Sequence, residues 1–304
     1  MSTESSSRWL PALAAEIRVR PLTASGLLLA AITILGLLSF NLGEPGKPQA
    51  WLYASLGGLA GFLATAFGAL LAVALRQLSA RAEDSLLGFA AGMMLSASAF
   101  SLITPGLAAA RGITGTPLLG ALTVVLGLFL GVLLMLGLER FTPHEHAHQG
   151  PCGPGRERVA RVWLFVLAIT LHNLPEGMAI GVSFSQGDLG VGLPLASAIA
   201  IQDIPEGLAV AMALRAAGLG NLRAIGLAAA SGLMEPLGAI LGLGMTHGLA
   251  LAYPIGLGLA AGAMIFVVSH EVIPETHRNG HQTPATLGLM TGFALMMVLD
   301  TALG

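Results

Sequence analysis

Nine apolar stretches, each about as long as a helix that crosses a bilayer, dominate the sequence. They cover roughly 23–40, 51–75, 86–110, 116–138, 162–184, 192–214, 224–245, 249–272 and 283–303. A helix needs about 20 mostly apolar residues to cross the hydrocarbon core. Only 10% of the residues are charged, whereas soluble proteins carry about 25%. We therefore predict an all-α polytopic membrane protein with one membrane domain. The net charge of -2 argues against a nucleic-acid partner.

The first apolar stretch, 23–40, has two interpretations. Arg8, Arg18 and Arg20 precede it, as basic residues precede the apolar core of a signal peptide. However, it is longer than the usual core, and no Ala-x-Ala cleavage site follows it. We favour a retained additional transmembrane helix after a cytoplasmic segment, 1–22, which could lie on the membrane surface as an interfacial helix.

The basic residues predict the orientation of the spans. With nine spans, twelve of the fourteen Lys and Arg residues fall on one side, and only Lys47 and Arg111 fall on the other. Cytoplasmic loops carry an excess of basic residues. We therefore expect a cytoplasmic N-terminus and a C-terminus outside. The loop 139–161 is then cytoplasmic, and it is rich in histidine.

The acidic residues are distributed differently from the basic ones. All Lys and Arg residues lie in loops or at span ends, but six acids fall within spans: Glu176, Asp203, Glu206, Glu235, Glu271 and Asp300. Burying one such charge costs about 2.5–3.5 kcal/mol even on the lenient insertion scale. Without basic partners, these carboxylates must be protonated, hydrated in a cavity or bound to cations. Glu271 and Asp300 lie near span ends, where an acid is also tolerated without a function.

One motif occurs on two successive spans. The sequence reads HNLPEG at 172–177 and QDIPEG at 202–207, and Glu235-Pro236 follows on the next span. Residues three or four positions apart share a helix face, so each motif presents a cluster of N and O ligands. Pro175 and Pro205 each free a backbone carbonyl and should kink their helices. Successive spans run in opposite directions, so the motif forms an inverted repeat, which is typical of secondary transporters.

The ligand types narrow the choice of cation. His172 offers an imidazole, Asn173 and Gln202 offer amide oxygens, and thiolates are absent from both motifs. Mixed N and O ligation suits zinc, iron(II), manganese, cobalt and cadmium, whereas magnesium prefers oxygen alone. The four central carboxylates exceed the need of one divalent ion. Either two metal ions bind or some carboxylates titrate with protons.

These motifs resemble those of the ZIP (Zrt/Irt-like protein) family of divalent-metal transporters, and the sequence is close to the bacterial prototype in the GufA-type branch. The resemblance implies transport of zinc, and of cadmium, iron(II) or manganese, across the bacterial inner membrane into the cytoplasm. It also implies a site for two ions. The first ion would take His172, Glu176, Gln202 and Glu206. The second would take Asn173, Asp203 and Glu235, with Glu176 and Glu206 bridging.

The resemblance further implies an eight-helix transport unit over 51–303 with a 3+2+3 inverted repeat and an elevator-type motion. The moving bundle would comprise 51–75, 162–184, 192–214 and 224–245. The scaffold would comprise 86–110, 116–138, 249–272 and 283–303. The span 23–40 departs from this eight-helix pattern.

Other residues are weaker candidates for the metal pathway. His144, His146 and His148 resemble the family's metal-collecting loop, but a solvated low-complexity loop is an equal alternative. Four residues near the end of span eight could receive exiting metal: His270, Glu271, Glu275 and His277. Met94, Ser101 and Asp300 could line the pathway, although we favour packing for Met94 and Ser101.

The sequence also bears on functions other than a metal carrier. A membrane metalloprotease would need His-Glu-x-x-His, and 270–274 lacks the second histidine. A metal sensor or structural bundle would not explain the inverted motif. An ion channel for the same metals, or a proton- or sodium-coupled carrier of another solute, remains as an alternative. No nucleotide-binding loop is present, so we predict a secondary transporter rather than an enzyme. The oligomeric state is open, and a homodimer is one alternative.

Overall fold

The computed structural model describes most of the chain. The described residues are 17–41, 48–75, 78–141, 144–146, 150–152, 161–216, 219–246, 249–277 and 279–303. For 40–41, 144–146, 150–152, 161–169 and 216, the description covers the backbone alone.

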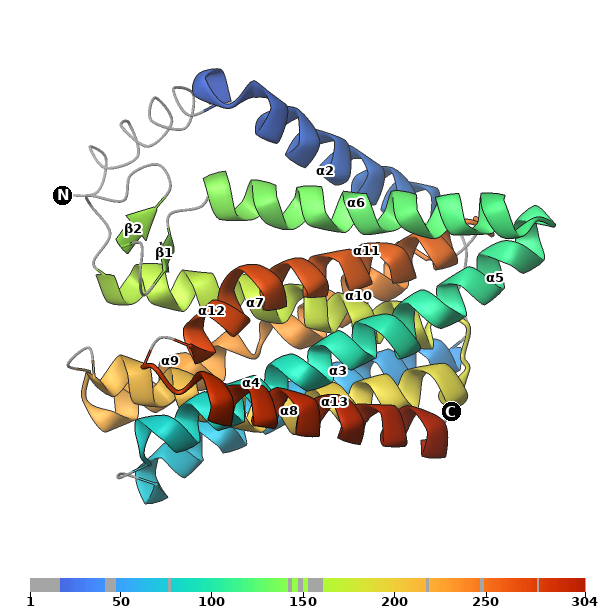
Figure 1. Ribbon diagram of the computed structural model, residues 1–304. Coiled ribbons are helices and arrows are strands. Elements are labelled where there is room, and N and C mark those ends of the chain that lie inside the picture. The colour runs from blue at the N-terminus through green and yellow to red at the C-terminus, as the bar shows by residue number, and fades with distance from the viewer. Residues whose placement is uncertain are drawn as a thin grey trace.

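Long helices build almost all of the described structure (Figure 1). In chain order, the first half contains α2 (Pro21–Asn41), α3 (Pro48–Ala74), α4 (Ala80–Ala97), η1 (Ser98–Ile103), α5 (Thr104–Thr114) and α6 (Pro117–Phe141). Two three-residue strands, β1 (His144–His146) and β2 (Gly150–Cys152), pair antiparallel. The second half contains α7 (Arg161–Phe184), α8 (Leu189–Ala216), α9 (Asn221–Ser231), α10 (Met234–Gly244), α11 (Ala252–Val267), η3 (Val268–Val272), α12 (Ile273–Thr276) and α13 (Gln282–Leu303).

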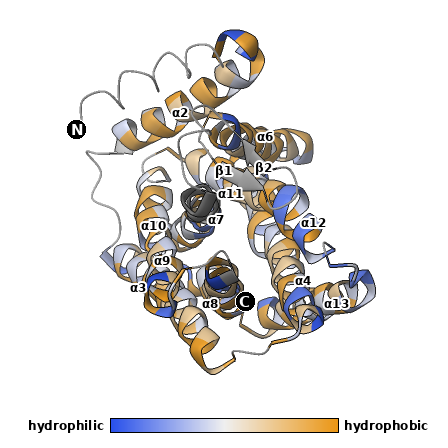
Figure 2. Ribbon diagram, turned by 90° about the vertical axis from the view of Figure 1, so that its left-hand side faces the viewer, coloured by the Kyte–Doolittle hydropathy of each residue, from blue (hydrophilic) through white to orange (hydrophobic). Residues whose placement is uncertain are grey.

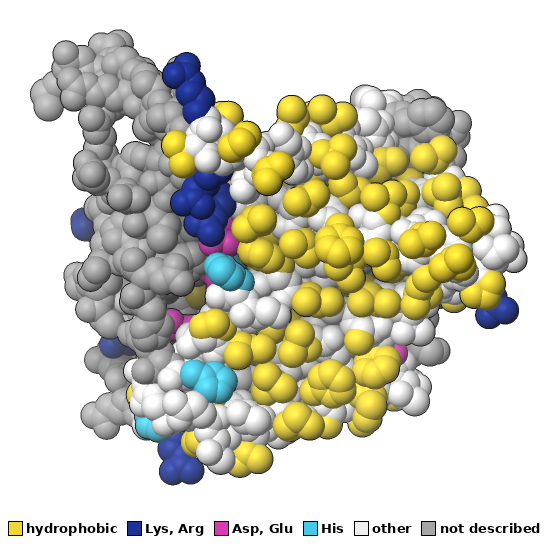
Figure 3. Space-filling view, turned by 45° about the horizontal axis from the view of Figure 1, so that its top comes forward, with side chains coloured by type: hydrophobic (Ala, Val, Ile, Leu, Met, Phe, Trp, Pro, Cys, Tyr) yellow, Lys and Arg dark blue, Asp and Glu magenta, His cyan; other side chains and the backbone are white. Residues whose placement is uncertain are grey.

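The predicted fold class, an all-α polytopic membrane protein, is confirmed. Within the described residues, eight helical stretches are long and apolar enough to cross a membrane. They are Pro21–Ser39, Pro48–Ala74, Ala80–Thr114, Pro117–Phe141, Leu189–Arg215, Asn221–Gly244, Ala252–Thr276 and Gln282–Leu303. The helix α7, with 24 residues, has the length of a further span. Hydrophobic side chains cover a broad face of the molecule, and charged and His side chains gather near its edges (Figure 3).

Three of these spans are not regular throughout. The π-helical segments η1 and η3 interrupt the spans Ala80–Thr114 and Ala252–Thr276. A turn at Gly232 and Leu233 separates α9 from α10, two residues before Glu235. Segments of π-helix and broken helices often occur at functional sites, because they redirect side chains and free backbone groups. The helices α7 and α8 continue through Pro175 and Pro205, and the kinks expected at these prolines stay a prediction.

Glycine allows neighbouring helices to approach until their backbones touch. In α7 and α10, glycines four residues apart face the other helix: Gly177 and Gly181 on α7, and Gly238 and Gly242 on α10. The α4–α13 and α6–α11 pairs use glycines with the same spacing on both helices. Small residues at such spacing are typical of membrane helix packing, where lipid supplies no hydrophobic drive between helices.

The helices pack in pairs around the predicted site. The most extensive contacts occur in the pairs α4–α13, α3–α8, α7–α10 and α6–α11, followed by α3–α10. Contacts of α8 with α4 and α13, and of α7 with α11, are smaller and join these pairs. Seen along the helices, α7 lies in the interior, and α2 lies outside against α6 (Figure 2).

Candidate metal centre

The seven predicted central ligands come from three helices. On α7 they are His172, Asn173 and Glu176, on α8 they are Gln202, Asp203 and Glu206, and on α10 the ligand is Glu235. Glu176, Gln202 and Glu235 are fully buried, and Asn173 and Asp203 are at most 2% exposed. Glu206 and His172 are partly exposed.

Three carboxylates from these helices converge on one point. Glu176, Asp203 and Glu206 each offer a carboxylate oxygen, and these oxygens lie within 4.8 Å of one another. The amide of Gln202 links the two motifs, since its Nε2 donates to Glu176 Oε1 at 2.7 Å. Like charges at such distances repel each other, so the cluster requires a cation or protons to neutralise it.

Basic side chains do not supply this neutralisation in the described part of the chain. Its Lys and Arg side chains are exposed or partly exposed, and none is buried. The partly buried Arg215 directs its Nη1 to the carbonyl of Ala72 at 2.6 Å, where it caps the end of α3. This distribution agrees with the acid-only interior that the sequence indicated.

Several oxygens of the centre accept no hydrogen bond from any described residue. They belong to five of the seven predicted ligands: Asn173 Oδ1, Glu176 Oε2, Gln202 Oε1, Asp203 Oδ2 and Glu235 Oε2. An unsatisfied buried polar atom costs roughly 1–3 kcal/mol, and native structures contain few of them. Five such oxygens in one cluster are suited to metal ligation, because a cation would satisfy all of them.

Glycines in the motifs and on α3 bring the ligands together. A Cβ atom at Gly177, the last residue of HNLPEG, would lie 2.7 Å from Glu235 Cα. A Cβ atom at Gly207, the last residue of QDIPEG, would lie 3.1 Å from Thr65 Cα. A Cβ atom at Gly61 would overlap Glu235 Oε2 and lie 3.1 Å from Asp203 Oδ2. The space left by the absence of a Cβ atom at these three glycines is therefore part of the site.

Thr65 and Gly61 on α3 also contact the centre, and the sequence did not predict this for either residue. Thr65 is 2% exposed, and its Oγ1 donates to Glu235 Oε1 at 2.9 Å. Thr65 and Glu235 are 170 positions apart in the chain. The available signal was a threonine within an apolar span, which by itself does not point to a distant carboxylate.

His172 is directed toward the segment η3. Its Nε2 lies 2.6 Å from Glu271 Oε2, and the two side chains are 13% and 14% exposed. Glu271 belongs to the π-helical segment η3. The sequence suggested Glu271 as an exit residue or a tolerated span-end acid, and the structure places it directly beside a predicted central ligand.

A second imidazole and carboxylate pair follows on the same segment. His270 Nε2 lies 3.1 Å from Glu139 Oε1, and the His270 ring stacks on Phe266 with centroids 5.2 Å apart. Glu139 is 7% exposed and belongs to α6, which extends to Phe141. The predicted span ended at 138, so Glu139 was expected in the following loop.

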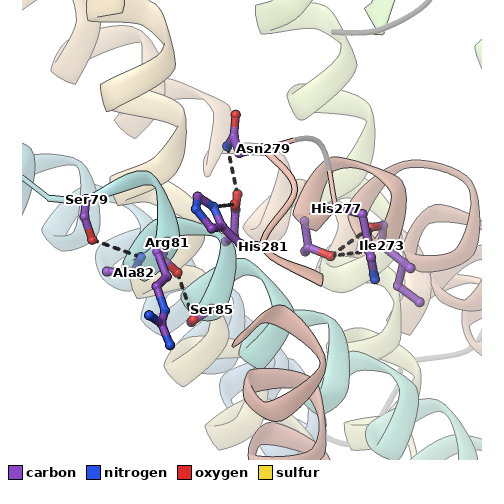
Figure 4. A network of polar contacts seen from close by, with 10 residues as sticks. Ser79, Arg81, Ala82, Ser85, Ile273, His277, Asn279 and His281 are labelled. Carbon is purple, nitrogen blue, oxygen red and sulfur yellow. Dashed lines mark hydrogen bonds and ion pairs between the residues drawn. The ribbon is translucent and has the colours of Figure 1, made fainter. Parts of the chain in front are cut away.

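The ends of α4 and α12 carry a further polar cluster (Figure 4). Asn279 Nδ2 donates to Asp84 Oδ1 at 3.1 Å, and His281 Nδ1 lies 2.8 Å from Asp84 Oδ2. Asp84 is 2% exposed, and it was missed because α4 begins before the predicted span. His277 instead turns back toward its own helix, with its Nδ1 2.8 Å from the carbonyl of Ile273.

The remaining predicted pathway residues lie in different surroundings. Ser101 Oγ donates to Asp300 Oδ1 at 2.6 Å and joins η1 to α13. Met94 is 1% exposed and packs in the hydrophobic core, as we favoured. Glu275 lies in the short helix α12. For His144 and His146 only the backbone of β1 is described, and His148 lies outside the described residues.

Comparisons with known proteins agree with the resemblance of the motifs. A model of the family described as "ZIP Zinc transporter" matches residues 140–300, more than half of the chain. The "Zinc transporter ZIPB" of Bordetella bronchiseptica is 66% identical over 252 residues, which cover 83% of this chain and 82% of the relative. The "Zinc transporter GufA" of Myxococcus xanthus is 45% identical over 84% of this chain and 99% of the relative.

A more distant relative is the human "Zinc transporter ZIP11", which is 30% identical over 79% of this chain and 94% of its own length. The relatives are named as transporters and not as enzymes, in agreement with the expectation for this chain. The family model covers both motif-bearing helices, and the matches cover 82%, 99% and 94% of the lengths of these three relatives. The chain belongs to the ZIP zinc transporter family.

Proposed function

We propose that this protein carries zinc across the bacterial inner membrane into the cytoplasm through the centre formed by α7, α8 and α10. The observation that carries this proposal is the group of buried oxygens without hydrogen-bond donors on five of the seven ligands. The names of its relatives support zinc as the cargo. Cadmium, iron(II) and manganese accept the same mixture of imidazole, carboxylate and amide ligands, so we expect them to compete.

Two ions occupy the centre in this proposal. The first takes His172, Glu176, Gln202 and Glu206, and the second takes Asn173, Asp203 and Glu235. Glu176 and Glu206 bridge the two ions, and the proximity of their oxygens to that of Asp203 supports this arrangement. Two divalent ions balance four carboxylates, so the loaded centre is nearly neutral and its burial in the membrane costs less.

His172 has two competing partners in this account. Its Nε2 lies 2.6 Å from Glu271 Oε2. We propose that the same nitrogen binds the first ion. When the first ion takes this nitrogen, Glu271 loses its contact with α7. In this account, the imidazole therefore exchanges the Glu271 carboxylate for the metal ion, and the contact between α7 and η3 changes with it.

The packing of the helices supports transport by alternating access. We propose that α3, α7, α8, α9 and α10 move together and carry every ligand, while α4, α5, α6, α11 and α13 remain as the scaffold. The most extensive helix pairs, α4–α13, α3–α8, α7–α10 and α6–α11, each lie within one group, which supports sliding at this boundary. The excess of basic residues on one side supports a cytoplasmic N-terminus and inward release of zinc.

Zinc flux into proteoliposomes tests this function. Wild-type protein should take up zinc with saturation, and Glu176→Ala and His172→Ala should lose most of the uptake. Added cadmium, iron(II) and manganese should reduce zinc uptake in the wild type. Equal flux in all three proteins would refute the site. Flux that rises with zinc without saturating would favour a channel, and flux of another solute without bound metal would favour a different carrier.

A further inference from the structure

Thr65 differs from six other described threonines of the membrane helices in what its hydroxyl does. A helical threonine commonly donates to the carbonyl four residues earlier. Six threonines in the described residues do this: Thr33, Thr114, Thr123, Thr246, Thr291 and Thr301. Thr65 instead donates across to Glu235 on another helix. Its hydroxyl therefore acts on a side chain of the metal centre.

The bond fixes one oxygen of Glu235 and leaves the other for a ligand. Thr65 Oγ1 donates to Oε1 at 2.9 Å, whereas Oε2 accepts no hydrogen bond from any described residue. Oε2 lies in the space opposite Gly61, which Asp203 Oδ2 also borders. Asp203 Oδ2 likewise accepts no hydrogen bond from the described residues. The donor thus sets the rotation of the carboxylate so that its open oxygen lies beside that of Asp203.

Thr65 also contacts the backbone at the two places that position the surrounding ligands. A Cβ atom at Gly207, next to Glu206 in the sequence, would lie 3.1 Å from Thr65 Cα. A Cβ atom at Gly232, in the turn that ends α9, would lie 3.0 Å from Thr65 Cβ. Glu235 follows Gly232 by three positions, at the start of α10. Thr65 therefore contacts α8, the turn before α10 and the carboxylate itself.

We propose that Thr65 is a positioning residue for the second metal ion, the one held by Asn173, Asp203 and Glu235. This inference rests on the proposed function. The Thr65 hydroxyl donates to Glu235, which is not a ligand of the first ion, so loss of the hydroxyl acts on the second ion. Hydrogen bonds behind a metal ligand orient it and typically account for 10- to 100-fold in metal affinity or activity.

The test compares two substitutions that separate the hydroxyl from the shape of the side chain. Thr65→Val keeps the shape and removes the donor, whereas Thr65→Ser keeps the donor and removes the methyl group. Thr291→Val is the matched control, because Thr291 donates only to its own helix. Glu235→Gln is the reference for a weakened second ion. The measurement is the number of zinc ions per chain of detergent-purified protein against free zinc, with the melting temperature without zinc beside it.

Thr65→Val should bind the second zinc about tenfold or more weakly, while the first zinc and the metal-free melting temperature stay close to wild type. Thr65→Ser and Thr291→Val should bind both ions as the wild type does. Equal loss in Thr65→Val and Thr65→Ser, or no loss in Thr65→Val, would overturn the positioning role. If Glu235→Gln also keeps the second zinc, the two-ion assignment itself fails, and this inference fails with it.

Discussion

At the scale of single residues, the centre depends on glycines, which leave space for the ligands, as much as on the ligands themselves. Gly61 leaves the space that Glu235 Oε2 occupies, and Asp203 Oδ2 borders the same space. A methyl group there would force the Glu235 carboxylate out of its position. The backbone of α3 cannot easily shift to make room for this methyl group, because Gly58 and Gly68 on the same helix lie in close contact with Pro236 and Ile204.

Gly61→Ala should therefore abolish or strongly reduce zinc uptake in proteoliposomes. The control is Gly36→Ala on α2, because a Cβ atom at Gly36 has no described atom within 4 Å. Overpacking in a well-packed interior typically costs about 1–3 kcal/mol, so the protein should still fold and insert. Wild-type uptake by a folded Gly61→Ala protein would mean that the Glu235 carboxylate does not need its observed position.

At the scale of elements, glycine pairs hold the helices at backbone contact. A Cβ atom at Gly92 on α4 would lie 2.7 Å from the backbone carbon of Leu289 on α13. Gly92→Ala should lower the melting temperature, because the two backbones must separate to admit the methyl group. The expected loss is about 1–3 kcal/mol.

Gly112→Ala on α5 is the opposite case, since a Cβ atom there has no described atom within 4 Å. Replacing an unneeded helical glycine by alanine gains about 0.5–1 kcal/mol, so this variant should melt at or above the wild-type temperature. The measurement is the melting temperature of both variants and of the wild type in the same detergent. A lower melting temperature for Gly112→Ala than for Gly92→Ala would contradict the packing role of these glycines.

The spans could be predicted because the thickness of the bilayer sets helix length and forces apolar side chains outward. The ends of the spans were harder to predict. Asp84 and Glu139 lie inside α4 and α6 because each finds an imidazole partner, which offsets the burial of a charge. The turn at Gly232 and the π-helical segments also escaped prediction, because hydropathy does not register local hydrogen bonding.

The same limit applies to the centre. The ligands on α7 and α8 could be predicted because one motif repeats within each helix, where spacing fixes the shared face. The contributions of Thr65 and Gly61 depend on how α3 packs against α8 and α10, and sequence separation hides such contacts. The contact of His172 with Glu271 likewise joins α7 to η3, and the motif by itself does not predict that these two segments are neighbours.

At the scale of the whole molecule, the proposed motion requires the two helix groups to slide past each other. Val182 on α7 and Gly256 on α11 lie across this boundary, and a Cβ atom at Gly256 would lie 3.2 Å from Val182 Cγ1. A cysteine pair at these positions can form a disulfide, since the sulfur at 182 would lie near the second Cβ atom. The background would be Cys152→Ala, which removes the single native cysteine.

Oxidation of the Val182→Cys, Gly256→Cys protein should block zinc uptake, and a reductant should restore it. The control pair is Gly106→Cys with Leu257→Cys within the proposed scaffold, where the two Cβ atoms would lie 3.4 Å apart. That disulfide should leave uptake nearly intact, because both positions stay together. Undiminished uptake through the oxidised Val182→Cys, Gly256→Cys protein would exclude sliding at this boundary.

The most direct test of the central claim is to locate zinc in crystals of the protein by anomalous scattering at the zinc absorption edge. The account predicts two zinc ions between α7, α8 and α10, both within ligand distance of Glu176 and Glu206. In Glu176→Ala crystals grown with the same zinc concentration, both peaks should weaken or vanish. Zinc bound only elsewhere on the chain, or two peaks that persist unchanged in Glu176→Ala, would contradict the account.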